Sequence, residues 1–212
     1  MLKSRYLKLA LDAWQTARQD KLYPSVRDMS PAHMVPFIEH VAMLRREADC
    51  AYRISLMGTA LVELLGADVT GKDASAPHEE ASRDDLQRFH DFAFQTGCLC
   101  HSLREMHYPS GSRGSLEQLL LPLTHPDGTH DRFMIVADAS DEELSVGEKR
   151  DSNVFFGKLH HRMLYDAGTL QPLSTELNRP DPAIIRRYTC MHSIVPKIQT
   201  HYFPTTTTPS LQ

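Results

Sequence analysis

Three apolar runs follow one another closely in residues 98–138, and they limit what this chain of 212 residues folds into. The runs span residues 98–108, 115–124 and 131–138, and we expect each to be a β-strand. The segment between the last two contains Asp127-Gly128, a dipeptide that favours a tight hairpin turn. Consecutive strands joined by short turns predict an antiparallel meander.

A further pair of strands is predicted upstream. Residues 38–47 and 50–57 are separated by the short turn Ala48-Asp49. In the second run Tyr52, Ile54 and Leu56 alternate with polar residues, which is typical of a half-buried strand. The two runs therefore predict a hairpin.

Helices are expected between the hairpin and the meander. Residues 60–65 form a short apolar segment that ends at Gly66, and residues 82–96 place Leu86, Phe89 and Phe92 on one helical face. The order of two strands, helices and three strands indicates an α+β fold. We expect a five-stranded antiparallel sheet with these helices gathered on one face.

Both ends of the chain add further elements. Residues 2–20 predict a helix with two apolar rows that include Trp14, so it must bury them against its own domain or another chain. We favour a dimer contact, with capping of its own sheet as the alternative. A short helix is expected at 31–37, a helix at 152–165, and another helical pattern from residue 181. The predicted units are residues 1–36 (N-terminal helix and proline-rich lead-in), 37–140 (core), 141–203 (helical extension) and 204–212 (disordered tail).

Composition excludes several classes of protein. The net charge is -4, and acidic residues are concentrated in the middle of the chain, which does not suit a nucleic-acid phosphate backbone. The chain contains no apolar run long enough to predict a membrane-spanning helix. Its N-terminus also lacks the apolar region of a signal peptide. We therefore expect a cytoplasmic protein in which the cysteines are free thiols.

Several short motifs together resemble the PAS domain family. The relevant segments are Tyr52–Leu61, which reads Tyr-Arg-Ile-Ser-Leu-Met-Gly-Thr-Ala-Leu, and Leu65–Lys72, which contains Gly-Ala-Asp-Val-Thr-Gly. Trp14 with Arg18, Pro24 with Asp28, and Leu121-Pro122-Leu123 add to the likeness, which is greatest to a bacterial subfamily of short, often stand-alone PAS proteins. The resemblance implies a cleft between sheet and helices for a small molecule, dimerisation, and signalling to protein partners.

The ligand-binding residues follow from that implied cleft. If the sheet and the helices of residues 58–96 enclose an apolar pocket, nine residues are candidates to line it. They are Ile54, Leu56, Leu61, Leu65, Phe89, Phe92, Leu119, Leu121 and Ile135. A filled core is the alternative interpretation of the same residues, and the sequence does not tell which cofactor, if any, is bound.

Cys98, Cys100 and His101 form a Cys-x-Cys-His sequence, one residue short of the haem attachment motif. On a strand the two cysteines share a face and His101 points to the other. A second ligand pair at zinc spacing is missing, so we predict no metal site.

The favoured function is a non-catalytic sensory or regulatory module that binds a small ligand, a protein partner or both. Two alternatives stay open at this point. One is a ligand-free protein-interaction adaptor. The other is a small α+β enzyme that uses His101, His107 or Asp68 for acid–base chemistry, although the sequence contains no nucleophile-elbow, phosphate-loop or zinc-protease motif.

Overall fold

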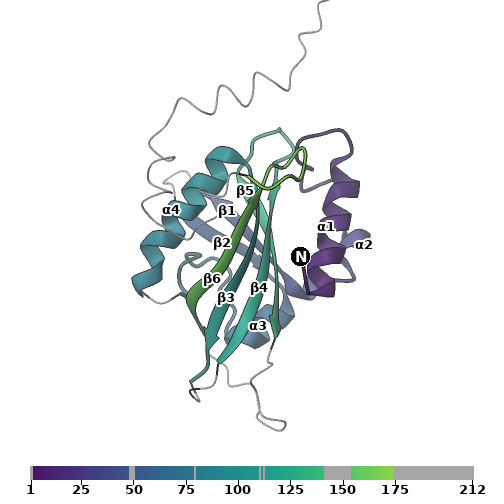
Figure 1. Ribbon diagram of the computed structural model, residues 1–212. Coiled ribbons are helices and arrows are strands. Elements are labelled where there is room, and N and C mark those ends of the chain that lie inside the picture. Colours follow the sequence, from purple (N-terminus) through teal and green to yellow (C-terminus); the bar gives the residue numbers. More distant parts are fainter. Residues whose placement is uncertain are drawn as a thin grey trace, which may run out of the picture.

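The computed structural model describes residues 2–47, 51–78, 80–109, 111, 113–140 and 154–173 (Figure 1). Its helical elements are α1 (Arg5–Arg18), α2 (Pro31–Met34), the short 3-10 helix η1 (Ile38–His40), α3 (Thr59–Leu65) and α4 (Glu80–Thr96). Its strands are β1 (Val41–Arg46), β2 (Tyr52–Met57), β3 (Leu99–His107), β4 (Arg113–Leu123), β5 (Arg132–Ser140) and β6 (Phe155–Tyr165). The turn predicted at Ala48-Asp49, the helical pattern from residue 181 and the tail lie outside the described residues.

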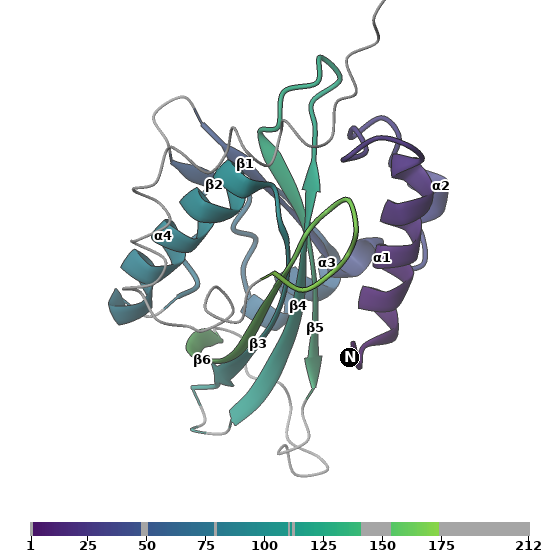
Figure 2. The ribbon, with the colours of Figure 1, turned by 45° about the horizontal axis from the view of Figure 1, so that its top comes forward.

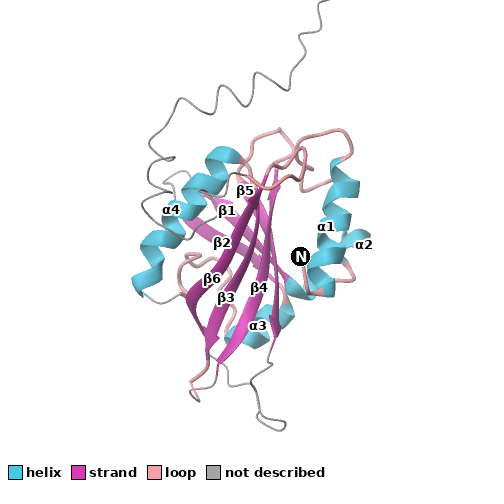
Figure 3. Cartoon of the chain, viewed as in Figure 1, coloured by secondary structure: helices cyan, strands magenta, loops and turns pink. Residues whose placement is uncertain are grey.

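The strands form one antiparallel sheet in the order β2-β1-β5-β4-β3-β6 (Figure 3). The predicted β1–β2 hairpin and the β3–β4–β5 meander are both confirmed, and so is the α+β class. The meander closes at the predicted Asp127-Gly128 turn, where the Gly128 N–H donates to the His125 carbonyl at 2.9 Å. The sheet has six strands, one more than the predicted five.

The sixth strand corrects the helix predicted at residues 152–165. This segment pairs along the length of β3 as strand β6, from Leu99 opposite Tyr165 to His107 opposite Phe155. Its register shifts twice, so the strict alternation that marks a strand is lost. Lys158 and His160 are exposed although Phe156 and Arg162, which have the same parity, are buried. Without that alternation, the spacing of the apolar residues in this segment fits a helix as well as a strand.

Helices cover the sheet on both faces (Figure 2). On the inner face, α3 and α4 pack against the strands, and the Tyr52 hydroxyl on β2 donates a hydrogen bond to the Asp91 carboxylate on α4. On the outer face lies α1. At the start of α3, Gly58 approaches η1 so closely that a Cβ would collide with the backbone oxygens of Ile38 and Glu39. The glycine therefore lets the chain turn from β2 into α3 beside η1.

Helix α1 buries an apolar row against its own sheet, which was the alternative to the dimer contact that we favoured from the sequence. The row consists of Leu7, Ala10, Trp14 and Ala17. Trp14 is fully buried, and its indole Nε1–H donates to the Pro122 carbonyl oxygen on β4 at 2.8 Å. This contact joins the two motifs that contain these residues.

Each end of α1 is also held by polar contacts. At its start, the Glu117 carboxylate on β4 accepts the backbone N–H groups of Lys3 and Ser4 at 3.0 and 2.8 Å. Burial raises the pKa of Glu117, but these two bonds and one from His101 outweigh it, so the pKa lies below its ordinary value. At the other end, Arg18 donates to the carbonyls of Ala167 and Gly168, in the loop after β6. None of the helices in the described ranges is long and apolar enough to span a bilayer.

We predict that Trp14→Ala lowers the free energy of unfolding by about 3–5 kcal/mol, because it opens a cavity in the outer core and leaves the Pro122 carbonyl unpaired. Chemical denaturation followed by circular dichroism measures this, since Trp14 is the chain's single tryptophan. Asp12→Ala, at an exposed position of the same helix, is the control and should change the value by about 0.5 kcal/mol. Equal effects of the two substitutions would show that α1 is not anchored through Trp14.

Candidate ligand-binding cavity

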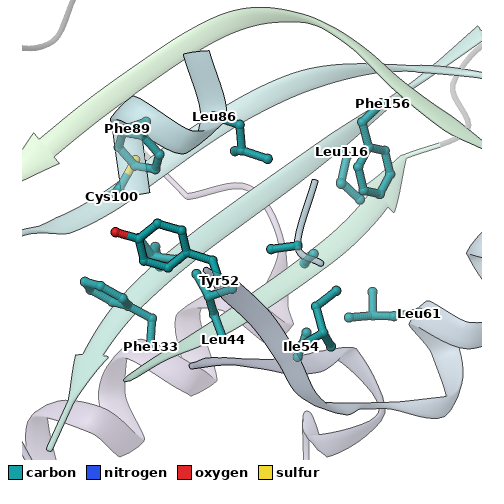
Figure 4. Packing of buried hydrophobic residues seen from close by; sticks show 14 of the residues in the cluster. Leu44, Tyr52, Ile54, Leu61, Leu86, Phe89, Cys100, Leu116, Phe133 and Phe156 are labelled. Carbon is teal, nitrogen blue, oxygen red and sulfur yellow. The ribbon is translucent and has the colours of Figure 1, made fainter. Parts of the chain in front are cut away.

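A cavity of about 90 Å³ lies between the inner face of the sheet and helices α3 and α4. One water molecule needs roughly 10–15 Å³ of such space, so the cavity has room for several waters or a small organic molecule. Figure 4 shows side chains of the helices, such as Leu61 and Phe89, beside side chains of the strands, such as Ile54 and Leu116, in this part of the core. Every strand of the sheet contributes to the lining.

Five of the nine candidate residues line this cavity. They are Ile54, Leu61, Leu65, Phe89 and Ile135. The other four, which do not, are Leu56, Phe92, Leu119 and Leu121. Leu56 is 43% exposed on β2, and Phe92 is buried elsewhere in the inner cluster. Whether the five bind a ligand stays a prediction.

Leu119 and Leu121 point to the outer face, toward α1. The β4 residues that face the cavity have the opposite parity and are Leu116, Gln118 and Leu120. Because both faces of β4 are buried, leucine occurs at both parities, and hydrophobicity alone does not tell which set faces the cavity. Each set also contains one polar residue, Glu117 in the first and Gln118 in the second, so polarity does not separate the two sets either.

Sequence reasoning missed the polar part of the lining. It consists of Ser102 and Arg104 on β3, Gln118 on β4, His78 in the segment before α4, His90 on α4 and Arg162 on β6. Arg104 and Arg162 are 5% and 2% exposed. Arg104 has the strand parity of the two cysteines, which the sequence analysis placed together on one face of this strand, so its face was open to inference. The position of Arg162 was hidden by the helical interpretation of β6.

Two histidines in the cavity wall are held in their neutral form. Burial lowers the pKa of His90 to about 3, and the charge of Arg162 adds to this effect. Burial also lowers the pKa of His78 well below its ordinary value, with a further contribution from Arg104. Both imidazoles are therefore uncharged at neutral pH, and the positive charge of the cavity lies on the two arginines.

Of the residues considered for metal binding or catalysis, Cys100 lines the cavity, and Cys98, His101, His107 and Asp68 do not. Cys98 and Cys100 share the inner face of β3 and are free thiols, and burial raises the pKa of Cys100 to about 12, so it is protonated. His101 lies on the other side of the strand and bonds to Glu117, and Asp68 accepts the backbone N–H of Thr70 in an exposed turn. No group of three His, Cys, Asp or Glu suited to a metal occurs in the described part of the chain.

The fold and this cavity agree with a comparison to protein families, in which a family model for the PAS domain matches residues 2–136. The chain belongs to the PAS domain family. PAS domains are sensory signalling modules, and here the match covers α1 as well as most of the sheet. Membership in the bacterial stand-alone PAS subfamily stays a prediction.

The solved structures to which this chain is similar share little sequence identity with it. A light-oxygen-voltage domain studied with a flavin analogue has a TM-score of 0.41 and 12% identity, covering 53% of this chain and 84% of that chain. The light-state structure of the blue-light photoreceptor Aureochrome1 LOV has a TM-score of 0.36 and 13% identity, covering 54% and 91%. Among curated proteins, none matches this PAS protein.

The neutral histidines predict loss of stability in mild acid. An unfolded histidine has a pKa of about 6.5, so the unfolded chain binds protons that folded His90 does not. The free energy of unfolding is therefore highest above pH 6.5 and falls as the pH drops toward 3. His90 alone should lower it by about 1 kcal/mol between pH 6 and pH 5.

Urea unfolding of the wild type and of His90→Leu at these two pH values measures this contribution. The variant should lose about 1 kcal/mol less than the wild type. His160→Gln, at an exposed position on β6, is the control and should behave as the wild type. A His90→Leu variant with the same pH dependence as the wild type would contradict the neutral state of His90.

Proposed function

We propose that this PAS domain is a non-catalytic sensory or regulatory module that binds a small molecule in the cavity and relays its presence to a protein partner. The observation that carries the proposal is the cavity itself. Protein cores are packed about as densely as organic crystals, so a space of about 90 Å³ with polar groups in its wall is unusual in a filled core. The adaptor alternative requires no such space.

A route for the signal is provided by strand β4. Leu116 and Leu120 face the cavity, while Leu119 and Leu121 between and beyond them pack on the outer face with α1. A ligand that displaces β4 from its cavity face therefore also moves the outer face, on which α1 packs. We propose α1 as the element that passes the change to a partner.

A second copy of this chain is the partner we propose. The outer side carries large apolar side chains that are exposed, namely Leu9 on α1, Val35 after α2 and Ile38 at η1. Covering such side chains is a common reason for association. Cytoplasmic location is part of the same proposal.

A substitution that fills the cavity should abolish ligand binding and leave the free energy of unfolding nearly unchanged. Ala137 on β5 lines the cavity, and Ala137→Leu is expected to remove any co-purified mass from the native mass spectrum while keeping the free energy of unfolding within about 1 kcal/mol of wild type. Ala10→Leu in the packed outer cluster is the control and should cost about 1–3 kcal/mol. A similar cost for Ala137→Leu, together with a bare polypeptide mass for the wild type, would favour the ligand-free adaptor.

The same native spectra test the dimer. The wild type should appear as a dimer, and Val35→Glu should convert it to a monomer, because the carboxylate would be buried at the contact. Leu56→Glu removes another exposed apolar side chain, on β2, and should leave the dimer intact. A monomeric wild type would contradict the proposed contact.

A further inference from the structure

Two arginine side chains lie together in the cavity wall, on neighbouring strands. Arg162 on β6 is directly opposite Ser102 on β3, and Arg104 is the next residue of β3 on the same face. Diagonal neighbours of this kind are within reach of each other when the side chains are long. Burial, and then the charge of Arg162, lowers the pKa of Arg104 to about 10, so both guanidinium groups are charged at neutral pH.

The protein satisfies only part of the hydrogen-bonding capacity of these groups. Arg104 Nη1 donates to the Gly157 carbonyl at 3.0 Å. Arg162 lies over the Phe89 ring at 4.0 Å, and its Nη2 is 3.6 Å from Asp85 Oδ2, which is too long for a hydrogen bond. Arg104 Nε, Arg162 Nε and Arg162 Nη1 are buried and find no hydrogen-bond partner in the ranges that the structure describes.

The charges around the cavity do not cancel either. The two arginines carry two positive charges, and His78 and His90 are neutral. The carboxylate that pairs with Arg162 is that of Asp85, which leaves one positive charge in excess among the cavity groups named here. A buried charge without a counter-charge is costly, and so is a buried donor without an acceptor. An anion with more than one acceptor oxygen relieves both costs at once.

We propose that the ligand of the cavity is a small organic carboxylate, held by Arg104 and Arg162 at its charged end and by the apolar wall at its other end. The inference rests on the proposed ligand-binding function and adds the chemical class. A planar guanidinium matches the two oxygens of a carboxylate, and charge-assisted bonds of this kind are the strongest hydrogen bonds in proteins. Ser102 and Gln118 offer further polar contacts, and Leu61, Leu65 and Ile135 provide the apolar part of the lining.

Pairs of carboxylates and their uncharged amides test this class without knowledge of the natural ligand. We use benzoate with benzamide and hexanoate with hexanamide, titrated into the full chain by calorimetry after removal of co-purified molecules. Each carboxylate should bind at least about tenfold more tightly than its amide, as expected for one hydrogen bond to a charged group. This comparison needs no variant, so it does not depend on the folding of a mutant.

Three substitutions assign the preference to the arginines. Arg162→Met and Arg104→Met should each weaken carboxylate binding by about tenfold to a hundredfold and leave amide binding nearly unchanged. Asp85→Asn should act in the opposite direction and strengthen carboxylate binding, because it removes the competing carboxylate. Lys158→Met deletes an exposed cation from the same strand as Arg162 and is the matched control, with no effect on either probe.

The outcomes separate this inference from the function it rests on. Amides that bind as tightly as carboxylates would show that the ligand is uncharged, which overturns the inference and keeps the proposed function. Carboxylate binding that survives both arginine substitutions would also overturn it, because the anion would then bind elsewhere. Failure of all four probes, with a bare polypeptide mass for the untreated protein, would contradict both.

Discussion

The central strands of this protein are apolar on both faces, and neither face is left to water. On β4 the residues Leu116 and Leu120 are buried on the inner side, and Leu119 and Leu121 on the outer side. This single requirement places α3 and α4 on one face and α1 on the other. The packing differs between the two faces. Helix α1 packs tightly around Trp14 on the outer face, whereas α3 and α4 leave a cavity between themselves and the inner face.

The parts of the fold that local sequence patterns determine were predictable. The β1–β2 hairpin and the meander are specified by short alternating runs and by turn residues such as Asp127-Gly128, and α3 ends at Gly66 as expected. Strand β6 was not predictable from alternation, since its register shifts against β3 place Lys158 in solvent and Arg162 in the core although both have the same parity. Most of the cavity lining was missed, in part for a similar reason. Which face a leucine of β4 points to depends on the register with its neighbours, and that is not a local property.

The polar groups of the cavity escaped sequence reasoning because charged residues are normally assigned to the surface. Buried arginines are rare, and they add little to stability even when paired, so their presence in a core calls for another explanation. The motif residues, in contrast, turned out to be structural. Trp14 and Arg18 connect α1 to β4 and to the loop after β6, and Pro122 supplies the carbonyl that accepts the indole N–H. These three motif residues therefore hold the helix in place, whereas the two arginines lie in the cavity wall.

The position of β6 in the chain has an evolutionary consequence. The part that matches the PAS family ends at residue 136, and β6 follows at Phe155–Tyr165, so one of the two cavity arginines comes from the shared domain and the other from outside it. In the sheet, the edge strand β6 pairs with a single strand, β3, whereas α1 packs on β4 and β5. If the proposed carboxylate binding holds, exchange of this one strand would change the charge of the cavity without changing the pairing among β1 to β5.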